Sequence, residues 1–173
     1  MDSGLKPSPD LIPEKAITIT FSGYHLTAHF DLLQKKANDT YLIFDWKTNT
    51  KYPSHQRVAE RMQTLVYPVA LDNFLRLKSK DNPSDSRIEM IYWYPEFPDK
   101  PHRFTFTSQT LEYQKTNLID LIAEISQNSE ENFSLTDEID KCKYCQYRSY
   151  CNREITAGES VDRDIDDISI NLV

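Results

Sequence analysis

Glycine is scarce in this sequence, and its scarcity excludes two large classes of nucleotide-binding protein. The 173 residues contain only three glycines, Gly4, Gly23 and Gly158. Neither a G-x-G-x-x-G dinucleotide fingerprint nor a Walker A phosphate loop can be assembled from glycines so far apart. Rossmann-type dinucleotide enzymes and P-loop NTPases are therefore excluded.

Long apolar runs are missing as well. No stretch approaches the roughly 18 apolar residues that a membrane-spanning helix requires. The mean hydropathy is −0.62, and 27% of the residues are charged. Since 173 residues can bury a single core of two or three layers, we expect one soluble globular domain with no membrane partner.

Cysteine is rare and confined to one place. The three cysteines, Cys142, Cys145 and Cys151, lie within ten residues of one another. An extracellular disulfide framework uses an even number of cysteines spread along the chain, and no charged-then-apolar signal segment opens this sequence. We therefore expect a cytoplasmic protein whose odd cysteine trio needs an explanation other than disulfides.

An excess of basic charge is also lacking. The net charge of −7 argues against a protein that binds nucleic acid by bulk electrostatics. Residues 129–173 hold 11 acidic and 5 basic residues, whereas residues 1–128 hold 16 and 15. Within the neutral part, residues 35–80 carry nine basic side chains against four acidic ones, a local net charge of +5.

The apolar pattern predicts a mixed α/β domain. The predicted order is strand, strand, strand, helix, strand, strand and helix, over residues 17–21, 24–30, 41–44, 54–77, 87–94, 102–107 and 108–127. The first two strands form a hairpin, and Asp31 closes the second of them. The third is apolar throughout, as is typical of a strand covered on both faces. Pro68 is expected to divide the first helix near Tyr67, because proline removes a backbone hydrogen bond.

Composition along the chain predicts four segments. Residues 1–13 are expected to be a disordered lead-in, since three prolines lie among polar neighbours. Residues 14–128 form the folded core, and residues 129–155 a cysteine-rich segment. Residues 156–173 are expected to be a solvated, flexible acidic tail.

Three charged residues lie where a buried strand ends. Asp45-Trp46-Lys47 follows the apolar run 41–44, and Asp31 lies 14 positions before Asp45. Two carboxylates at neighbouring strand ends form an oxygen-ligand site suited to Mg²⁺ or Mn²⁺. A lysine two residues beyond one ligand reaches water on such a metal, so the site suits phosphodiester hydrolysis.

Three short motifs carry a resemblance to a known family: Phe30-Asp31, the run 43–48 (IFDWKT) and the run 63–67 (QTLVY). Together they resemble the PD-(D/E)XK nuclease superfamily, in particular its RecB-like branch with the pattern D…D-x-K-T…Q-x-x-x-Y, over roughly residues 14–71. The resemblance implies a restriction-endonuclease-like α/β fold, a mixed sheet flanked by helices. It also implies a role for each site residue.

By this resemblance, Asp31, Asp45 and the carbonyl group of Trp46 bind the divalent metal ion. Lys47 positions the nucleophilic water or the scissile phosphate. Gln63 and Tyr67 orient Lys47 and the substrate, and all of these side chains count as catalytic. The basic stretch at residues 35–80 is expected to surround the site as a channel for a phosphate backbone.

The spacing Cys142-x2-Cys145-x5-Cys151 is similar to the C-terminal triplet of the iron–sulfur members of this branch, in which four thiolates hold a 4Fe-4S cluster. Their first cysteine precedes the first core strand, but this chain has no Cys or His before His25. We expect a shortened N-terminus, so that one cluster ligand is absent. A zinc site completed by His102, and reduced thiols without metal, remain the alternatives.

The sequence therefore predicts a Mg²⁺- or Mn²⁺-dependent DNA nuclease acting in repair, recombination or defence. Its expected substrate is single-stranded DNA or DNA ends, and its expected partner is a helicase or another repair subunit. The first alternative is a catalytically inactive DNA-binding or scaffolding module that keeps the nuclease fold. A second alternative is a zinc-stabilised interaction domain.

Overall fold

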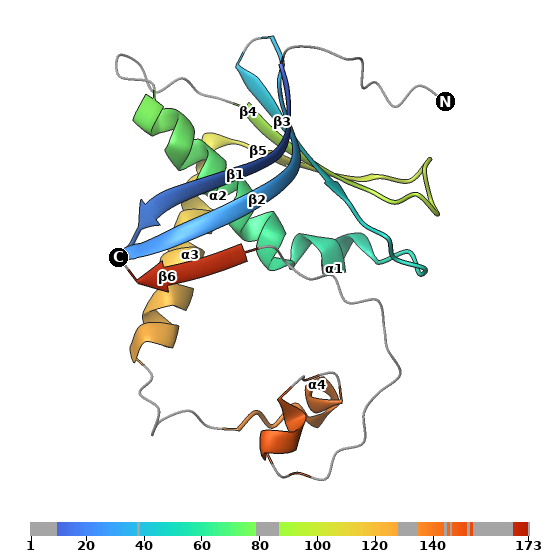
Figure 1. Ribbon diagram of the computed structural model, residues 1–173, viewed down its shortest axis with the longest axis vertical. Helices are drawn as coiled ribbons and strands as arrows, with labels where there is room; N and C mark the ends of the chain where they lie inside the picture. The colour runs from blue at the N-terminus through green and yellow to red at the C-terminus, as the bar shows by residue number, and fades with distance from the viewer. Residues whose placement is uncertain are drawn as a thin grey trace.

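The protein is built around one mixed sheet (Figure 1). A computed structural model describes residues 10–37, 39–78, 87–127, 135–143, 145, 147–151, 153 and 168–172. The strands are β1 (Leu11–Phe21), β2 (Tyr24–Lys35), β3 (Thr40–Trp46), β4 (Arg87–Trp93), β5 (His102–Phe106) and β6 (Ile168–Leu172). The helices are α1 (His55–Ala59), α2 (Met62–Lys78), α3 (Ser108–Gln127) and α4 (Ile139–Cys142), with a 3₁₀ turn at Arg148–Cys151.

The predicted hairpin is confirmed, and its turn explains the need for Gly23. Ser22 and Gly23 both have positive φ, at 49° and 81°. Two central residues with positive φ are typical of a type I′ turn, whose twist matches that of the strands it joins. The hairpin is longer than predicted, because β1 begins at Leu11 and β2 continues to Lys35.

Strand β2 changes its partner at Asp31. On one edge it pairs with β1 along its length. On the other edge, its first half (Tyr24–Ala28) pairs with β6, and its last residues (Leu32–Lys35) pair with β3. The prediction that Asp31 ends a strand is therefore wrong. Asp31 lies within β2, one residue before the pairing with β3 begins, and in that register it falls opposite Asp45.

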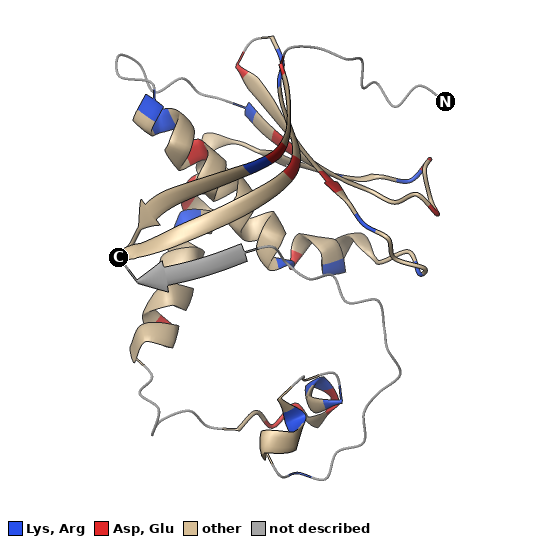
Figure 2. Cartoon of the chain, in the orientation of Figure 1, with Lys and Arg blue, Asp and Glu red and all other residues tan. Residues whose placement is uncertain are grey.

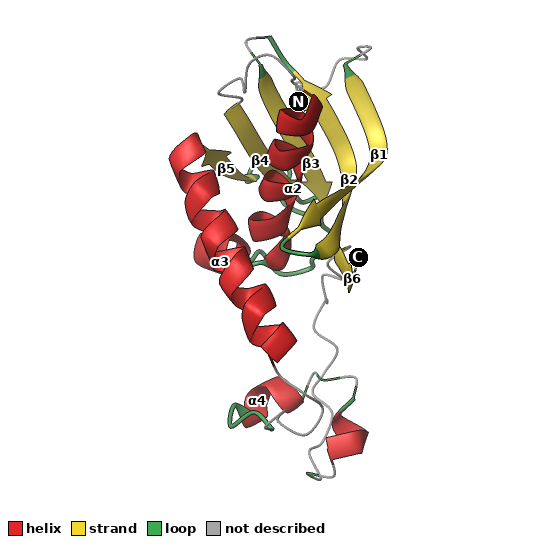
Figure 3. Cartoon of the chain, turned by 90° about the vertical axis from the view of Figure 1, so that its left-hand side faces the viewer, coloured by secondary structure: helices red, strands yellow, loops and turns green. Residues whose placement is uncertain are grey.

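The central pair of strands, β3 and β4, runs parallel, and the other pairs are antiparallel. Helices α1 and α2 form the connection that a parallel pair requires. Helix α2 lies against one face of the sheet, and α3 packs beside it (Figure 3). Leu42, Ile43, Phe44 and Asp45 of β3 are all buried, so the prediction of a strand covered on both faces is confirmed.

The prediction that Pro68 divides the long helix is wrong. The break lies earlier, at residues 60–61, between α1 and α2, and Pro68 is inside an unbroken α2. Proline at this position leaves the carbonyl of Thr64, four residues before it, without its helical hydrogen bond. Gln114 of α3 compensates, because its Nε2 donates to the Thr64 carbonyl at 3.3 Å.

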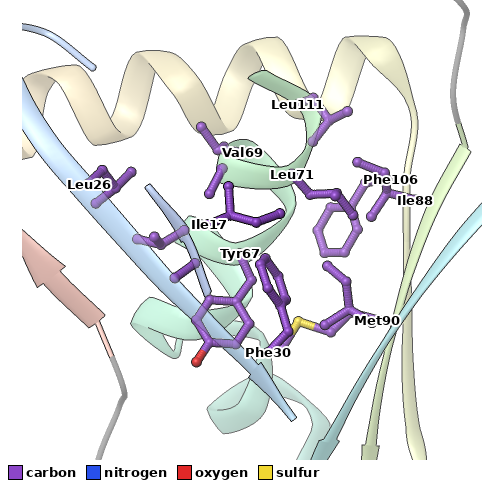
Figure 4. Close-up of a cluster of buried hydrophobic side chains, with 14 of the residues drawn as sticks. Ile17, Leu26, Phe30, Tyr67, Val69, Leu71, Ile88, Met90, Phe106 and Leu111 are labelled. Atoms are coloured by element: carbon purple, nitrogen blue, oxygen red, sulfur yellow. The ribbon is translucent and has the colours of Figure 1, made fainter. Parts of the chain in front are cut away.

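The core lies between the sheet and the two long helices (Figure 4). Its members come from β1 to β5 and from α1, α2 and α3. Those labelled in Figure 4 are Ile17, Leu26, Phe30, Tyr67, Val69, Leu71, Ile88, Met90, Phe106 and Leu111. Helix α2 is covered on nearly every side, since most of its residues from Gln63 to Asp72 are buried. A core on this scale fixes α2 against β2, where the rings of Tyr67 and Phe30 meet.

Both ends of the chain differ from the predictions. The lead-in was expected to reach residue 13, but residues 11–13 belong to β1; residues 1–9 lie outside the described part. The flexible acidic tail was expected to reach residue 173, but Ile168–Leu172 forms β6, paired antiparallel with β2. Along the described residues, none of the helices has the length and apolar character needed to cross a bilayer.

Candidate active site

Asp45 and Lys47 form a buried ion pair at the end of β3. Lys47 Nζ lies 3.1 Å from Asp45 Oδ2, and the two side chains are 8% and 3% exposed. Alternation along an extended chain points residues two apart to the same side, which brings both groups to the helix-covered face. The backbone N–H of Lys47 donates to the Trp93 carbonyl at 2.9 Å, so β4 holds the lysine backbone in place.

Asp31 is joined to the same strand end by a backbone hydrogen bond. The N–H of Trp46 donates to Asp31 Oδ2 at 2.7 Å. This contact forms where β2 leaves β6 and joins β3, so the change of strand partner brings the Asp31 carboxylate to the end of β3. The structure therefore brings together the three charged residues singled out in the sequence.

The protonation of Asp45 reflects this environment. Burial raises the pKa of Asp45 to about 7, from an ordinary value of 3.8. The ammonium of Lys47 opposes this rise in pKa, the carboxylate of Asp31 adds to it, and the guanidinium of Arg61 opposes it more weakly. Two carboxylates that influence each other at a buried strand end favour the arrival of a cation.

The oxygen atoms at this site fit a small divalent cation. Mg²⁺ prefers oxygen ligands and is usually held by one or two carboxylates, with water and substrate phosphate completing the shell. Asp31, Asp45 and the Trp46 carbonyl would supply that set. Over the residues that the structure describes, no three His, Cys, Asp or Glu side chains gather as a metal site. A cation here therefore depends on carbonyl, water or phosphate oxygens besides the two carboxylates.

Gln63 and Tyr67 meet each other on the first turns of α2. Gln63 Nε2 donates to the Tyr67 hydroxyl at 3.1 Å, and both residues are almost fully buried. The ring of Tyr67 also lies 4.9 Å from that of Phe30, the residue before Asp31. The pair thus packs against the strand that carries Asp31, and its role in orienting Lys47 and the substrate stays a prediction.

Sequence reasoning missed two residues, Arg61 in the break before α2 and Thr64 in its first turn. Thr64 is buried, and its hydroxyl contacts both the Val58 carbonyl (2.6 Å) and the Tyr92 hydroxyl (2.8 Å). The guanidinium of Arg61 lies 5.5 Å from the centre of the Tyr92 ring, and Lys47 Nζ lies 6.0 Å from it. Arg61 had been counted only as part of the basic stretch. Its place two residues before the Q-x-x-x-Y motif was the available signal.

The segment from Lys47 to α1 is fixed by stacked rings. Tyr52 stacks on His102 with centroids 4.7 Å apart, and His55 stacks on Phe104 at 4.6 Å. His102 Nε2 lies 3.1 Å from the Pro53 carbonyl, and its Nδ1 lies 3.3 Å from His55 Nδ1. Desolvation lowers the pKa of His102, which keeps its ring neutral. Both ring nitrogens of His102 therefore have partners within this segment, and a zinc site completed by His102 stays a prediction.

The basic stretch does not surround the site as predicted. Lys35 and Lys36 lie at the turn before β3, the end opposite Asp45. Arg76 and Lys78 lie in the last turn of α2, about 20 Å along the helix from its start. Figure 2 shows basic residues on α1 and at the far end of α2. The basic residues near the site are those between the end of β3 and the start of α2.

The three cysteines lie in and around α4 and the 3₁₀ turn. All three are free thiols; Cys142 is buried, and Cys145 and Cys151 are partly exposed. The N–H of Cys145 donates to the Cys142 carbonyl at 3.1 Å, and Arg148 binds the Cys145 carbonyl through its backbone and side chain. They do not form a three-ligand metal group within the described residues. Binding of a 4Fe-4S cluster by these cysteines stays a prediction.

A mixed sheet that presents two carboxylates and a lysine at the end of a buried strand defines an α/β protein of restriction-endonuclease-like architecture. The chain belongs to the PD-(D/E)XK nuclease superfamily, whose family model matches residues 6–152. The predicted family and fold class are therefore confirmed. The match extends past Cys142, Cys145 and Cys151. Membership of the RecB-like branch stays a prediction.

A solved structure shows a distant likeness. The chain aligns with the crystal structure of a protein named SSO0001 at 16% identity and a TM-score of 0.46. The alignment covers 90% of this chain and 66% of that one, so this chain spans less than two thirds of its length. None of the curated proteins matches the sequence significantly.

Proposed function

We propose that this protein is a metal-dependent nuclease that hydrolyses DNA phosphodiester bonds. The observation that carries the proposal is the buried Asp45–Lys47 ion pair, 3.1 Å apart, joined to Asp31 through the Trp46 backbone. Membership of a nuclease superfamily supports the same reaction.

The chain's own residues have separable roles in this proposal. Asp31, Asp45 and the Trp46 carbonyl hold a Mg²⁺ or Mn²⁺ ion. When bound, the cation polarises the phosphoryl oxygen and acidifies the attacking water. Lys47, fixed by Asp45, positions that water or the scissile phosphate and stabilises the negative charge that grows in the transition state. Gln63 and Tyr67 orient the Lys47 side chain and the substrate.

Replacing either member of the ion pair tests the proposal. We expect Lys47→Ala and Asp45→Asn to lower the cleavage rate of labelled DNA by about 100- to 1,000-fold, since each removes a preorganised charge from the site. EDTA should abolish cleavage, and Mg²⁺ or Mn²⁺ should restore it. Lys78→Ala, a lysine at the far end of α2, is the matched control and should cleave as the parent does.

The alternative of an inactive DNA-binding module gives a different result. It predicts that the parent binds DNA without cutting it in any divalent metal. Equal cleavage by the parent and Lys47→Ala would contradict the proposed site itself. Comparing single-stranded oligonucleotides, blunt duplexes and closed circles in one gel assay separates these outcomes.

We further propose that the substrate is single-stranded DNA or DNA ends, processed in the cytoplasm during repair, recombination or defence, alongside a helicase or another repair subunit. Lys47, Lys51, Arg57 and Arg61 between β3 and α2 suit contact with a phosphate backbone. Free thiols suit a reducing compartment. Preference for unpaired over paired DNA in a competition assay checks the substrate.

The cysteine segment is proposed as a metal-binding element that needs an additional ligand. Cys142, Cys145 and Cys151 supply three thiolates, one fewer than a 4Fe-4S cluster uses. Iron, sulfide and zinc analysis of anaerobically purified protein distinguishes a cluster from zinc. Protein free of iron, sulfide and zinc would show that the cysteines are structural thiols, and the cleavage assay described above tests the carboxylate and lysine site separately.

A further inference from the structure

A cleft of about 420 Å³ opens next to Arg61, whose charge also acts on Asp45. It lies between the α1–α2 junction, β5 and α3, and its lining includes Arg61, Phe104, Thr110, Tyr113, Gln114 and Asn117. The volume falls within the range of about 300–1,000 Å³ that is usual for sites binding small organic groups. None of the roles given above to the site residues uses this cleft.

Helix α3 presents a distinct face to the cleft. Thr110, Tyr113, Gln114 and Asn117 follow the i, i+3, i+4, i+7 spacing of one helical stripe. The core-facing residues of α3, such as Leu111 and Leu118, are different and fully buried. Within this stripe, Thr110 already bonds Thr107, and Gln114 Nε2 donates to the Thr64 carbonyl. The Tyr113 ring and the Asn117 amide are the groups of the stripe suited to contact a planar heterocycle, by stacking and by hydrogen bonding.

Tyr113 is the exposed aromatic residue of this stripe. Its side chain is 68% exposed although it lines a cleft, whereas Phe104 on the opposite wall is partly buried and stacks on His55. An aromatic ring open to solvent on one wall is available to stack with a base.

Arg61 connects the cleft to the catalytic carboxylates. It lines the cleft, and its guanidinium lies 5.5 Å from the ring centre of Tyr92. Tyr92 is the residue of β4 that pairs with Asp45 in the parallel register. Glu60, the acidic residue in the cleft lining, accepts a hydrogen bond from Gln56 Nε2 at 3.0 Å. The positive charge of Arg61 therefore lies on the side of the cleft nearest the candidate active site.

We propose that this cleft binds one unstacked base of a single-stranded DNA substrate, next to the scissile phosphate, with Tyr113 as the stacking surface and Arg61 beside the adjoining phosphate. The proposal rests on the nuclease function proposed above. A base paired in a duplex is stacked on both faces and cannot enter such a cleft, so the subsite selects unpaired DNA.

The test combines an abasic scan of the DNA with substitution of Tyr113. A set of single-stranded oligonucleotides is used, each with one abasic position at a different place along its length. The affinity of the protein for each is measured by fluorescence anisotropy in Ca²⁺. The parent should lose about 5- to 150-fold in affinity at one position beside the cleavage point, the usual effect of one lost stacking contact. Tyr113→Ala should bind intact DNA more weakly by a similar factor and no longer distinguish that abasic position.

Matched variants complete the design. Tyr113→Phe keeps the ring and should bind as the parent does, and so should Ile125→Ala, an exposed residue of α3 outside the cleft lining. Arg61→Gln should reduce the slope of log affinity against log salt by about 0.7, the value for one phosphate contact on a single strand. Thermal unfolding should be unchanged in Tyr113→Ala, because that side chain is exposed.

The outcomes separate the two proposals. Normal cleavage with no abasic position that distinguishes the parent from Tyr113→Ala would overturn the base subsite and leave the nuclease proposal standing. Absence of both binding and cleavage in the parent would overturn both.

Discussion

At the scale of single residues, the most informative side chain is Asp45. It is 2% exposed, yet it must be ionised to hold a cation. The fold raises its pKa to about 7 by burial, so in the metal-free protein the carboxyl binds a proton that the unfolded chain has already released. Burial therefore disfavours the ionised form of Asp45 as long as no metal ion is bound.

This conflict gives a prediction about stability and pH. Between the ordinary pKa of 3.8 and the folded value of about 7, the folded protein binds more protons than the unfolded chain. The free energy of unfolding contributed by Asp45 therefore falls as pH rises through this window and is level above it. In EDTA, the free energy of unfolding of Asp45→Asn, relative to that of the parent, should therefore rise by about 2–3 kcal/mol from pH 5 to pH 8.

Urea unfolding of both proteins at the two pH values measures this difference. Any constant effect of the amide cancels in the comparison. Asp120→Asn, an exposed position on α3, should show no such gain. Mg²⁺ should reduce the difference at pH 8, because a bound cation favours the carboxylate. A gap between parent and Asp45→Asn that is the same at both pH values would contradict the raised pKa.

At the scale of elements, α2 shows how a local defect is repaired by a neighbour. Pro68 removes the donor for the Thr64 carbonyl, and Gln114 of α3 supplies another. The two helices are also joined by Lys115 Nζ, 2.9 Å from Asp72 Oδ2. With α3 in place, α2 continues past the proline, and its first turns carry Gln63 and Tyr67 of the candidate site.

A double-mutant cycle tests this repair. Gln114→Ala should destabilise the parent by about 1–3 kcal/mol, the cost of leaving a buried carbonyl without a donor. In a Pro68→Ala background the helix supplies its own N–H to Thr64, so the same substitution should cost less. Chemical unfolding of the four proteins gives the coupling energy, and equal costs in both backgrounds would rule out the compensation.

At the scale of the whole molecule, the C-terminal strand completes the sheet. Without β6, the backbone of Tyr24–Ala28 in β2 would have no partner on the edge that β3 does not reach. Unpaired strand edges associate with other chains, and proteins usually cover or interrupt them. Strand β6 therefore protects the sheet at the end remote from Asp45.

Removing residues 161–173 tests that role. We expect the shortened protein to form dimers or larger species with increasing concentration, measured by size-exclusion chromatography with light scattering. The monomeric fraction should keep the metal-dependent cleavage of the full chain, since the pairing of β6 with β2 ends at Ala28 and does not include Asp31. A shortened protein that stays monomeric and equally stable would show that β6 contributes little.

Much of this fold could be predicted because its signals are local. Alternating apolar residues located the β1–β2 hairpin, and an apolar run located β3. The break near Pro68 was predicted wrongly, because the donor that replaces the lost hydrogen bond comes from Gln114, 50 residues away from Thr64. The strand at residues 168–172 was missed because its pairing with β2 spans almost the whole chain.

The candidate site, too, could be predicted from the sequence only in part. By itself, the sequence determined the family and the residues to examine, since the Asp-x-Lys spacing and the Q-x-x-x-Y turn are local properties of a strand end and a helix. Only the tertiary structure decided that Asp31 meets Trp46 within a strand, that Arg61 stands over Tyr92, and that the basic residues do not all gather at the site. Those facts depend on strand register and helix placement, which long-range packing sets.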